Sequence, residues 1–262
     1  MNKRVIQEVL ADQWEVVQEQ GFLTRAFDWE ENLNYCLVGI RRAGKSYLLI
    51  QRIHELLKEG VSEDHILYVN FEDERLLEMT AGDLHLLLEV QAEFAEDHKV
   101  THVFLDELQN VTGWEKFVRR LADSKYHVYV TGSNAKMLSR EIATTLGGRF
   151  MMRVVYPYDF SEYLMALGID GSPRKQLTMK GKAAISSAFD AYLENGAFPE
   201  LIDVHSKRMY LNNIYQTIYL GDIIARNGIG NEFAVRLLLK KIAESVCYPL
   251  SLIHISEPTR PY

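Results

Sequence analysis

The sequence predicts an α/β fold, a parallel sheet sandwiched by helices and followed by a helical extension. Short apolar runs alternate along the first 160 residues with segments whose apolar residues recur at helical spacing. A glycine-containing loop stands between the first of these runs and the helix that follows it. Such alternation is typical of parallel sheets, whose ligands bind beyond the carboxyl ends of the strands.

Composition limits the classes of protein. The chain has 262 residues, 47% of them hydrophobic, and a net charge of −7. Because it has no long basic tract, we do not expect it to bind nucleic acid electrostatically over its whole surface. The composition is still compatible with a local basic patch. Two cysteines, Cys36 and Cys247, are too few for a disulfide framework or a zinc site. Residues 1–15 do not resemble a signal peptide, and no apolar stretch approaches the ~20 residues that span a bilayer. We therefore expect a cytoplasmic protein with no membrane partner.

The first expected elements are a helix and a strand. Apolar residues near helical spacing predict an amphipathic helix over about residues 3–19: Val5, Val9, Leu10, Trp14 and Val17. Residues 35–38, Tyr-Cys-Leu-Val, form a short apolar run typical of a buried parallel strand.

The loop after this strand fits the phosphate-loop, or Walker A, pattern Gly-x-x-x-x-Gly-Lys-Ser/Thr of nucleoside triphosphatases. Its glycines let successive N–H groups face inward as an anion nest, and the N-terminus of the next helix adds positive potential. Lys45 would reach the β- and γ-phosphates, and the Ser46 hydroxyl would hold Mg²⁺. The expected nucleotide-binding residues are Gly39, Ile40, Arg41, Arg42, Ala43, Gly44, Lys45, Ser46 and the adjoining Tyr47.

The alternative for this loop is a glycine turn in which Lys45 and Ser46 are incidental. Context favours the phosphate loop, because a strand precedes it and a helix follows it. Gly60 marks the end of that helix. The helix itself is predicted by apolar residues at helical spacing, namely Leu49, Ile53, Leu56 and Leu57.

A second strand is expected at residues 66–69 and a helix over residues 84–94. The apolar run 103–105 then leads into Asp106 and Glu107, which is the Walker B pattern. Asp106 would hold Mg²⁺, directly or through water, and Glu107 would orient or deprotonate the attacking water. Thr112 and Glu115 predict a capping box at the start of the next helix.

A strand at residues 128–130 leads into Thr131, Gly132, Ser133 and Asn134. Ser133 and Asn134 would sense the γ-phosphate or position water, or this segment would cap a helix over residues 135–143. A fifth strand is expected at residues 150–155. Arg149, just before it, would stabilise transition-state charge in its own subunit or in a neighbour's, unless it forms an ordinary ion pair.

The chain changes character after about residue 165. We expect an ATPase core over residues 1–165, a linker over 166–183 that holds a small basic cluster, and the helical start of a further domain over 184–249. Helices are expected over about residues 184–195, 209–226 and 233–246.

Taken together, these segments resemble the prokaryotic AAA-like P-loop ATPases that carry a C-terminal domain of unknown function. The resemblance covers residues 20–249. It is carried by residues 39–46, 68–73, 105–109 followed by Trp114 and Glu115, 131–134, Gly148 with Arg149, 157–163 and 196–200.

The resemblance implies a core with a catalytic glutamate. Lys45, Ser46, Asp106 and Glu107 match its motifs one by one, whereas Arg149 matches more loosely. It also implies a winged-helix segment and a nuclease-like fold beyond about Pro249, hence DNA contact through that part. Assembly into a homo-oligomer is left open. Ala197 stands where a second glycine is usual.

Residues 250–262 differ in kind from the rest of the chain. They resemble the translation of a transposase sequencing adapter, so we expect a non-native tail in a chain whose natural gene continues.

The leading hypothesis is Mg²⁺-dependent binding and hydrolysis of ATP. The alternative is an ATP-switched DNA-binding or regulatory module with little turnover. A small-molecule kinase is weaker, because no acceptor site is evident and Glu107 beside Asp106 suits activation of water.

Overall fold

The structure is a computed structural model that describes residues 1–97, 99–132, 146, 148–225 and 228–245. The chain divides into two compact units, Met1–Lys207 and Arg208–Tyr262. No helix among the described residues combines the length and the apolar character needed to cross a membrane.

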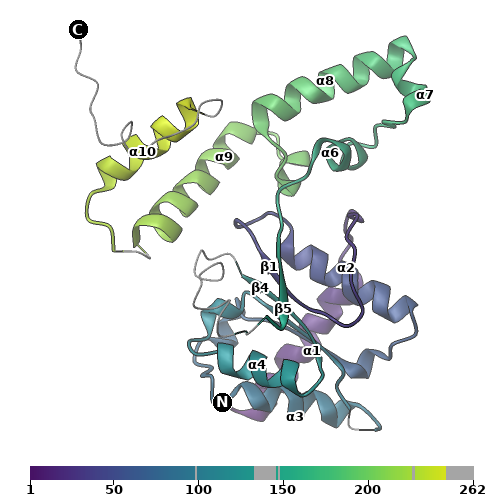
Figure 1. Cartoon of the computed structure of the whole chain (residues 1–262), viewed down its shortest axis with the longest axis vertical. Helices are drawn as coiled ribbons and strands as arrows, with labels where there is room; N and C mark the ends of the chain where they lie inside the picture. The colour runs from purple at the N-terminus through teal and green to yellow at the C-terminus, as the bar shows by residue number, and fades with distance from the viewer. Residues whose placement is uncertain (98, 133–145, 147, 226–227, 246–262) are drawn as a thin grey trace. The chain divides into compact units, whose positions relative to one another are not determined.

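The first unit contains a five-stranded parallel sheet with the strand order β2-β3-β4-β1-β5. Figure 1 shows the sheet and labels β1, β4 and β5. The expected fold class is therefore confirmed, and β4 lies between β1 and β3. The strands are β1 (Asn34–Val38), β2 (Ile66–Asn70), β3 (His102–Asp106), β4 (His127–Gly132) and β5 (Phe150–Val154).

The pairing of the strands gives the sheet two distinct edges. At the carboxyl edge, Val38 of β1 pairs with Gly132 of β4 and with Val154 of β5. At the amino edge, His102 of β3 pairs with His127 of β4, and Asn34 pairs with Phe150. The segments that follow Val38 and Asp106 therefore begin at the carboxyl edge, where Gly132 also lies.

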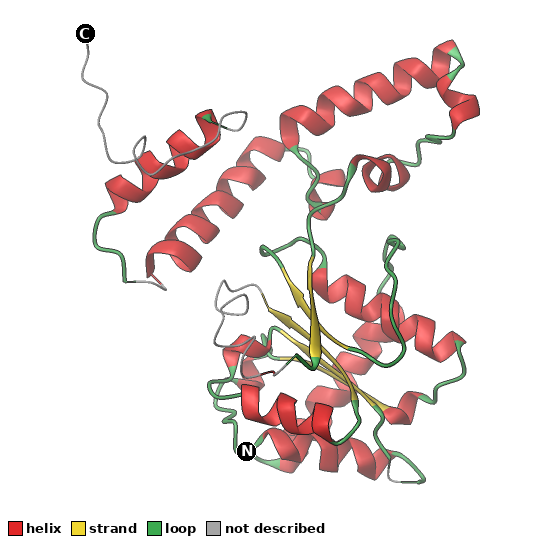
Figure 2. Cartoon of the chain, in the orientation of Figure 1, coloured by secondary structure: helices red, strands yellow, loops and turns green. Residues whose placement is uncertain are grey.

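Helices cover both faces of the sheet, as Figure 2 shows. One core cluster joins the strand residues Cys36 and Val38 to α1 (Lys3–Glu19), α3 (Leu84–Phe94) and α4 (Glu115–Asp123). The other joins Tyr35 and Leu37 to α2 (Lys45–Lys58). Alternate residues of one strand therefore enter opposite cores, which explains why the strands read as continuous apolar runs.

The predicted capping box of α4 is wrong. The helix begins at Glu115 with Trp114 as its N-cap, and no side chain caps it. Gly113 has a φ of +81°, which is not helical, so the helix cannot extend back to Thr112. Burial of Trp114 in the core sets the start of this helix instead.

After the sheet, the first unit continues with α6 (Phe160–Ala166), α7 (Pro173–Gln176), α8 (Met179–Asn195) and a 3-10 turn at Pro199–Ile202. The expected linker 166–183 therefore contains α7 and the beginning of α8. The expected boundary near residue 165 stays a prediction, and residues up to Lys207 belong to the same compact unit as the sheet.

The second unit consists of helices. It contains α9 (Lys207–Gln216, whose first residue ends the first unit), a π-helical segment (Thr217–Ala225) and α10 (Glu232–Glu244). The helix expected over 209–226 thus changes its winding at Thr217. The Tyr219 hydroxyl donates a hydrogen bond to the Glu232 carbonyl (2.6 Å), which ties the π-helical segment to the start of α10.

Candidate functional site

The phosphate loop, residues 39–46, leads from β1 into α2. A Cβ on Gly39 would lie 2.3 Å from the carbonyl oxygen of Val155, so the close passage of the chain after β5 requires glycine there. Gly44 is the N-cap of α2 and has a φ of +95°. The two glycines are therefore needed for different reasons, one for a close approach and one for a left-handed backbone.

Arg42 also adopts the left-handed region, with a φ of +63°. Arg42 and Gly44 flank Ala43, whose φ is negative, and this alternation is what forms a backbone nest for an anion. The Arg42 guanidinium pairs with Glu200 (Nη1–Oε2 2.7 Å) and that of Arg41 lies 3.5 Å from Glu72. These two ion pairs join the loop to the segment after β2 and to the turn after α8.

Lys45 points back into the loop. Its side chain is 3% exposed, and its ammonium donates a hydrogen bond to the Ile40 carbonyl (3.1 Å). Lys45 Nζ also lies 3.6 Å from Glu107 Oε1. A buried ammonium is costly unless it is compensated, and here both partners come from the candidate site itself.

Asp106, the last residue of β3, is fully buried. Its carboxylate accepts hydrogen bonds from the hydroxyls of Ser46 and Thr131, and from that of Tyr68 (3.3 Å). Burial raises the pKa of Asp106, while the bonds from Ser46 and Thr131 act against that rise. The structure therefore brings the two expected metal ligands, Ser46 and Asp106, into direct contact.

Glu107 is in the left-handed region (φ 52°, ψ 40°), which costs a residue with a side chain about 1–2 kcal/mol. Its backbone N–H donates to the Thr131 hydroxyl (2.9 Å), and its carboxylate accepts a hydrogen bond from Gln109. These contacts hold the Glu107 carboxylate beside Lys45. Strain in a buried charged residue at a strand end is typical of functional positions.

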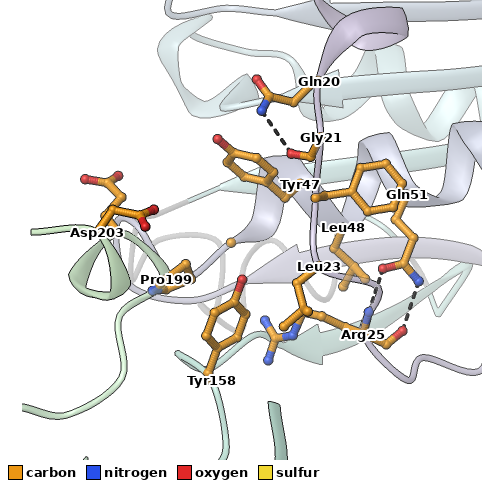
Figure 3. Close-up of a pocket in the computed structure, with 13 residues that line it drawn as sticks. Gln20, Gly21, Leu23, Arg25, Tyr47, Leu48, Gln51, Tyr158, Pro199 and Asp203 are labelled. Atoms are coloured by element: carbon orange, nitrogen blue, oxygen red, sulfur yellow. Dashed lines mark hydrogen bonds between the residues drawn. The ribbon is translucent and has the colours of Figure 1, made fainter. Parts of the chain in front are cut away.

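A cavity of about 320 Å³ adjoins the phosphate loop, and Figure 3 shows it. Gly44 and the expected nucleotide-binding residue Tyr47 line it, beside residues from the segment before β1 and from the turn after α8. Its aromatic side chains are Phe22, Tyr47 and Tyr158.

Arg149 is not with this group of residues. It precedes β5 at the amino edge, and five strand residues, about 3.3 Å each, separate it from the carboxyl edge. Its guanidinium pairs with Asp123 at the end of α4. The expectation that Arg149 acts in the site of its own subunit is thereby corrected, because strand pairing directs it to the opposite edge. A role in a neighbour's site stays a prediction.

Ser133 and Asn134 lie outside the described residues. Thr131, which precedes them, is buried and links Asp106 to the backbone of Glu107.

Sequence reasoning missed several residues that contact the loop or the acidic pair. Thr131 belongs to a polar strand end and Gln109 to the 105–109 segment, but neither pattern assigns that residue a contact. Arg25 had no local signal. Tyr68 and Glu162 lie in the segments 68–73 and 157–163, but these patterns indicated no role for either, because each acts through a contact with a residue distant in sequence.

Comparison with known proteins agrees with the geometry. An uncharacterized protein of Methanocaldococcus jannaschii is 32% identical over 241 residues, covering 90% of this chain and 52% of that protein. One of Haemophilus influenzae is 32% identical over 212 residues, covering 79% and 50%. The chain therefore spans about half the length of these relatives.

Among solved structures, AMPPCP-bound DnaA from Aquifex aeolicus matches with 14% identity and a TM-score of 0.42, over 90% of this chain and 68% of that one. Hsp104 of S. cerevisiae in complex with casein matches with 16% identity and a TM-score of 0.43, over 93% and 45%. Likeness at this level supports no statement about function.

Residues 31–164, about half of the chain, match the AAA domain family. This range contains the phosphate loop, Asp106, Glu107 and all five strands. The match and the geometry agree on a nucleotide-binding domain of the P-loop ATPase type, and the chain belongs to the AAA domain family.

Proposed function

We propose that this chain binds ATP with Mg²⁺ and hydrolyses it. The observation that carries the proposal is the meeting of Lys45 and Ser46, at the start of α2, with Asp106 and Glu107, at the end of β3. Lys45, Asp106 and Glu107 are buried, and Ser46 is half-buried. Lys45 contacts Glu107, and Ser46 contacts Asp106. Each contact therefore joins the phosphate-binding motif to the acidic motif.

The donor set suits Mg²⁺. Mg²⁺ prefers oxygen ligands and is usually held by one or two carboxylates together with substrate phosphates and water. The Ser46 hydroxyl and the Asp106 carboxylate, which touch each other, would hold it. When bound, Mg²⁺ would neutralise charge on the β- and γ-phosphates.

The remaining steps belong to the chain's own groups. The N–H groups of the nest and the N-terminus of α2 would bind the phosphate oxygens, and the Lys45 ammonium would turn from Ile40 and Glu107 to the phosphates. Glu107 would orient a water molecule and accept its proton. The water oxygen then bonds to the γ-phosphorus as the bond to ADP breaks.

The cavity beside the loop would take the base and ribose. It begins at Gly44, and the rings of Phe22, Tyr47 and Tyr158 offer apolar surface against which a purine could pack. One nucleotide would then extend from the cavity to Lys45.

The test is release of labelled phosphate from γ-labelled ATP by the purified chain, with Mg²⁺ and with a chelator. We expect release of labelled inorganic phosphate only when Mg²⁺ is present. Transfer of the label to another molecule would favour a kinase instead, and binding without release would favour an ATP-dependent switch.

DNA contact and assembly of identical subunits are proposals for the whole protein, since the chain spans about half the length of its relatives. The family resemblance at residues 20–249 supports the first of these, DNA contact. Salt-dependent DNA binding that changes with ATP would favour the regulatory alternative, whereas no DNA binding at low salt would count against it.

A further inference from the structure

Arg25 connects the phosphate loop to helix α6. Its Nε and Nη2 donate to the two carboxylate oxygens of Glu162 at 2.7 and 2.9 Å, and its Nη1 donates to the Ala43 carbonyl at 3.2 Å. Both charged side chains are 15% exposed. Glu162 follows β5, so this fork joins segments that are 137 residues apart in sequence.

The backbone of Arg25 is fixed as firmly as its side chain. The Gln51 side chain in α2 accepts a hydrogen bond from the Arg25 N–H and donates one to the Arg25 carbonyl, both at 2.9 Å; Figure 3 draws both bonds. The guanidinium carbon lies 5.6 Å from the ring centre of Tyr158. Contacts with α2, Tyr158 and Glu162 therefore fix both the backbone of Arg25 and the orientation of its guanidinium.

The contact with Ala43 fixes one peptide group of the loop. In a trans peptide the C=O and the N–H point in opposite directions, and the described chain has no cis peptide. A carbonyl of Ala43 that is held toward Arg25 therefore turns the N–H of Gly44 away from Arg25. Gly44, with its φ of +95°, has the backbone freedom to lose this orientation if the bond is removed.

Glu162 has a second task. Its Oε2 accepts a hydrogen bond from the Asp159 N–H at 2.9 Å, while its own N–H donates to Asp159 Oδ1 at 2.8 Å. This reciprocal pair is the capping box that starts α6. One carboxylate thus serves both the start of α6 and the partner of the phosphate loop.

We propose that Arg25 is a positioning residue that sets the 43–44 peptide of the phosphate loop for binding a nucleoside triphosphate, and that Glu162 is its required counterion. The affinity of the loop then depends on the start of α6. This inference rests on the proposed function and adds a determinant of affinity that lies outside both Walker motifs.

The first variants remove the fork. Arg25→Met leaves the Ala43 carbonyl without this partner and Glu162 with an uncompensated buried charge. Loss of a hydrogen bond to a charged group should weaken the affinity for Mg-ATP on the order of ten- to a hundredfold. Calorimetry measures this affinity. Glu162→Gln keeps one acceptor oxygen, which can serve the capping box, but loses the charge, so we expect a smaller loss of about tenfold.

Arg25→Lys is the conservative variant. A lysine keeps the charge but cannot engage Glu162 through two nitrogens and Ala43 through a third, so we expect an intermediate affinity. It also keeps the inference testable if Arg25→Met does not fold.

Arg52→Met is the matched control. Arg52 is a comparably buried arginine (side chain 9% exposed) on α2, and its guanidinium contacts Glu59 (2.9 Å), Glu55 and the Trp29 ring. We expect Arg52→Met to lower the melting temperature but to leave the affinity for Mg-ATP unchanged.

A second readout does not need nucleotide. Amide hydrogen exchange in the peptide that covers residues 39–46 should be faster in Arg25→Met and Glu162→Gln than in wild type, and unchanged in Arg52→Met. If wild type fails to bind ATP, the proposed function is wrong while the exchange data still decide how Arg25 acts. If wild type binds, and Arg25→Lys and Glu162→Gln match it in affinity and exchange, the inference is overturned.

Discussion

The two edges of the same sheet are built in opposite ways. At the carboxyl edge, Lys45, Asp106 and Glu107 are buried charged groups, and Glu107 has a left-handed backbone. At the amino edge, the rings of His102 and His127 stack with centroids 4.7 Å apart, and the Asn34 side chain joins the Arg149 carbonyl to the Val128 N–H.

The two edges differ in how much unfavourable free energy their residues contribute to the folded state. Buried charges and left-handed side chains cost free energy, so a fold that only needed its sheet would not gather them at one edge. The amino edge uses ordinary contacts, chiefly a side chain that bonds backbone groups and an ion pair between Arg149 and Asp123 at the surface. We therefore infer that the carboxyl edge is the functional one, and this contrast can be tested by mutation.

The largest expected effect comes from Glu107→Gln. The amide keeps the size of the side chain but cannot accept a proton, so turnover should fall on the order of a hundred- to ten-thousandfold while ATP binding persists. Phosphate release and calorimetry measure the two quantities. Glu74→Gln, at an exposed carboxylate after β2, is the control and should leave turnover unchanged. Normal turnover in Glu107→Gln would remove Glu107 from its role.

Asp106→Asn should act on the metal. Loss of the buried charge should raise the Mg²⁺ concentration that gives half-maximal phosphate release by about ten- to a hundredfold. Thermal unfolding should show that the variant still folds, because burial already disfavours the charged form of Asp106. An unchanged Mg²⁺ dependence would contradict the assignment of Asp106 as a ligand.

The amino edge should respond to pH. Burial, and then the neighbouring His127 and Arg52, lower the pKa of His102 to about 4. The unfolded chain would bind a proton near pH 6.5 and the folded chain only near pH 4, so the free energy of unfolding should fall as pH drops through that interval. We expect a loss of about 1–2 kcal/mol, discounted for partial exposure of the ring.

Denaturant unfolding at pH 7.5 and pH 5 measures this loss. In His102→Gln the difference between the two pH values should shrink. An equal pH dependence in wild type and in His102→Gln would show that this histidine does not carry the effect.

The smallest effect is expected for Arg149→Ala. The pair with Asp123 has side chains 36% and 47% exposed, so its loss should change the free energy of unfolding by less than about 1 kcal/mol. The affinity for ATP should not change, because the residue lies at the amino edge. A loss of turnover that depends on protein concentration would support action in a neighbouring subunit.

Much of the functional edge could be predicted from the sequence because its signals are local. The five apolar runs predicted the strands, and the spacing within residues 39–46 and 103–107 predicted which residues meet at their ends. Parallel strands place consecutive motifs at one edge, so Lys45 and Glu107 could be paired without coordinates.

The rest depends on contacts between distant segments. Arg25 lies in no motif, and the 157–163 motif indicates no role for Glu162, so only the packing of the segment before β1 against the start of α6 brings the two residues together. Arg149 was expected near the phosphates because it adjoins a strand, but it adjoins the wrong end of that strand. The start of α4 was missed because tertiary burial of Trp114 and the backbone of Gly113 override a local capping pattern.

The most direct test is a calorimetric titration of the folded chain with Mg-ATP, beside Lys45→Ala, whose buried ammonium lies in the phosphate loop. We predict saturable binding by wild type, and affinity reduced at least about a hundredfold in Lys45→Ala. No binding of any nucleoside triphosphate by well-folded wild type, or equal binding by both proteins, would contradict the assignment of the carboxyl edge as a nucleotide site.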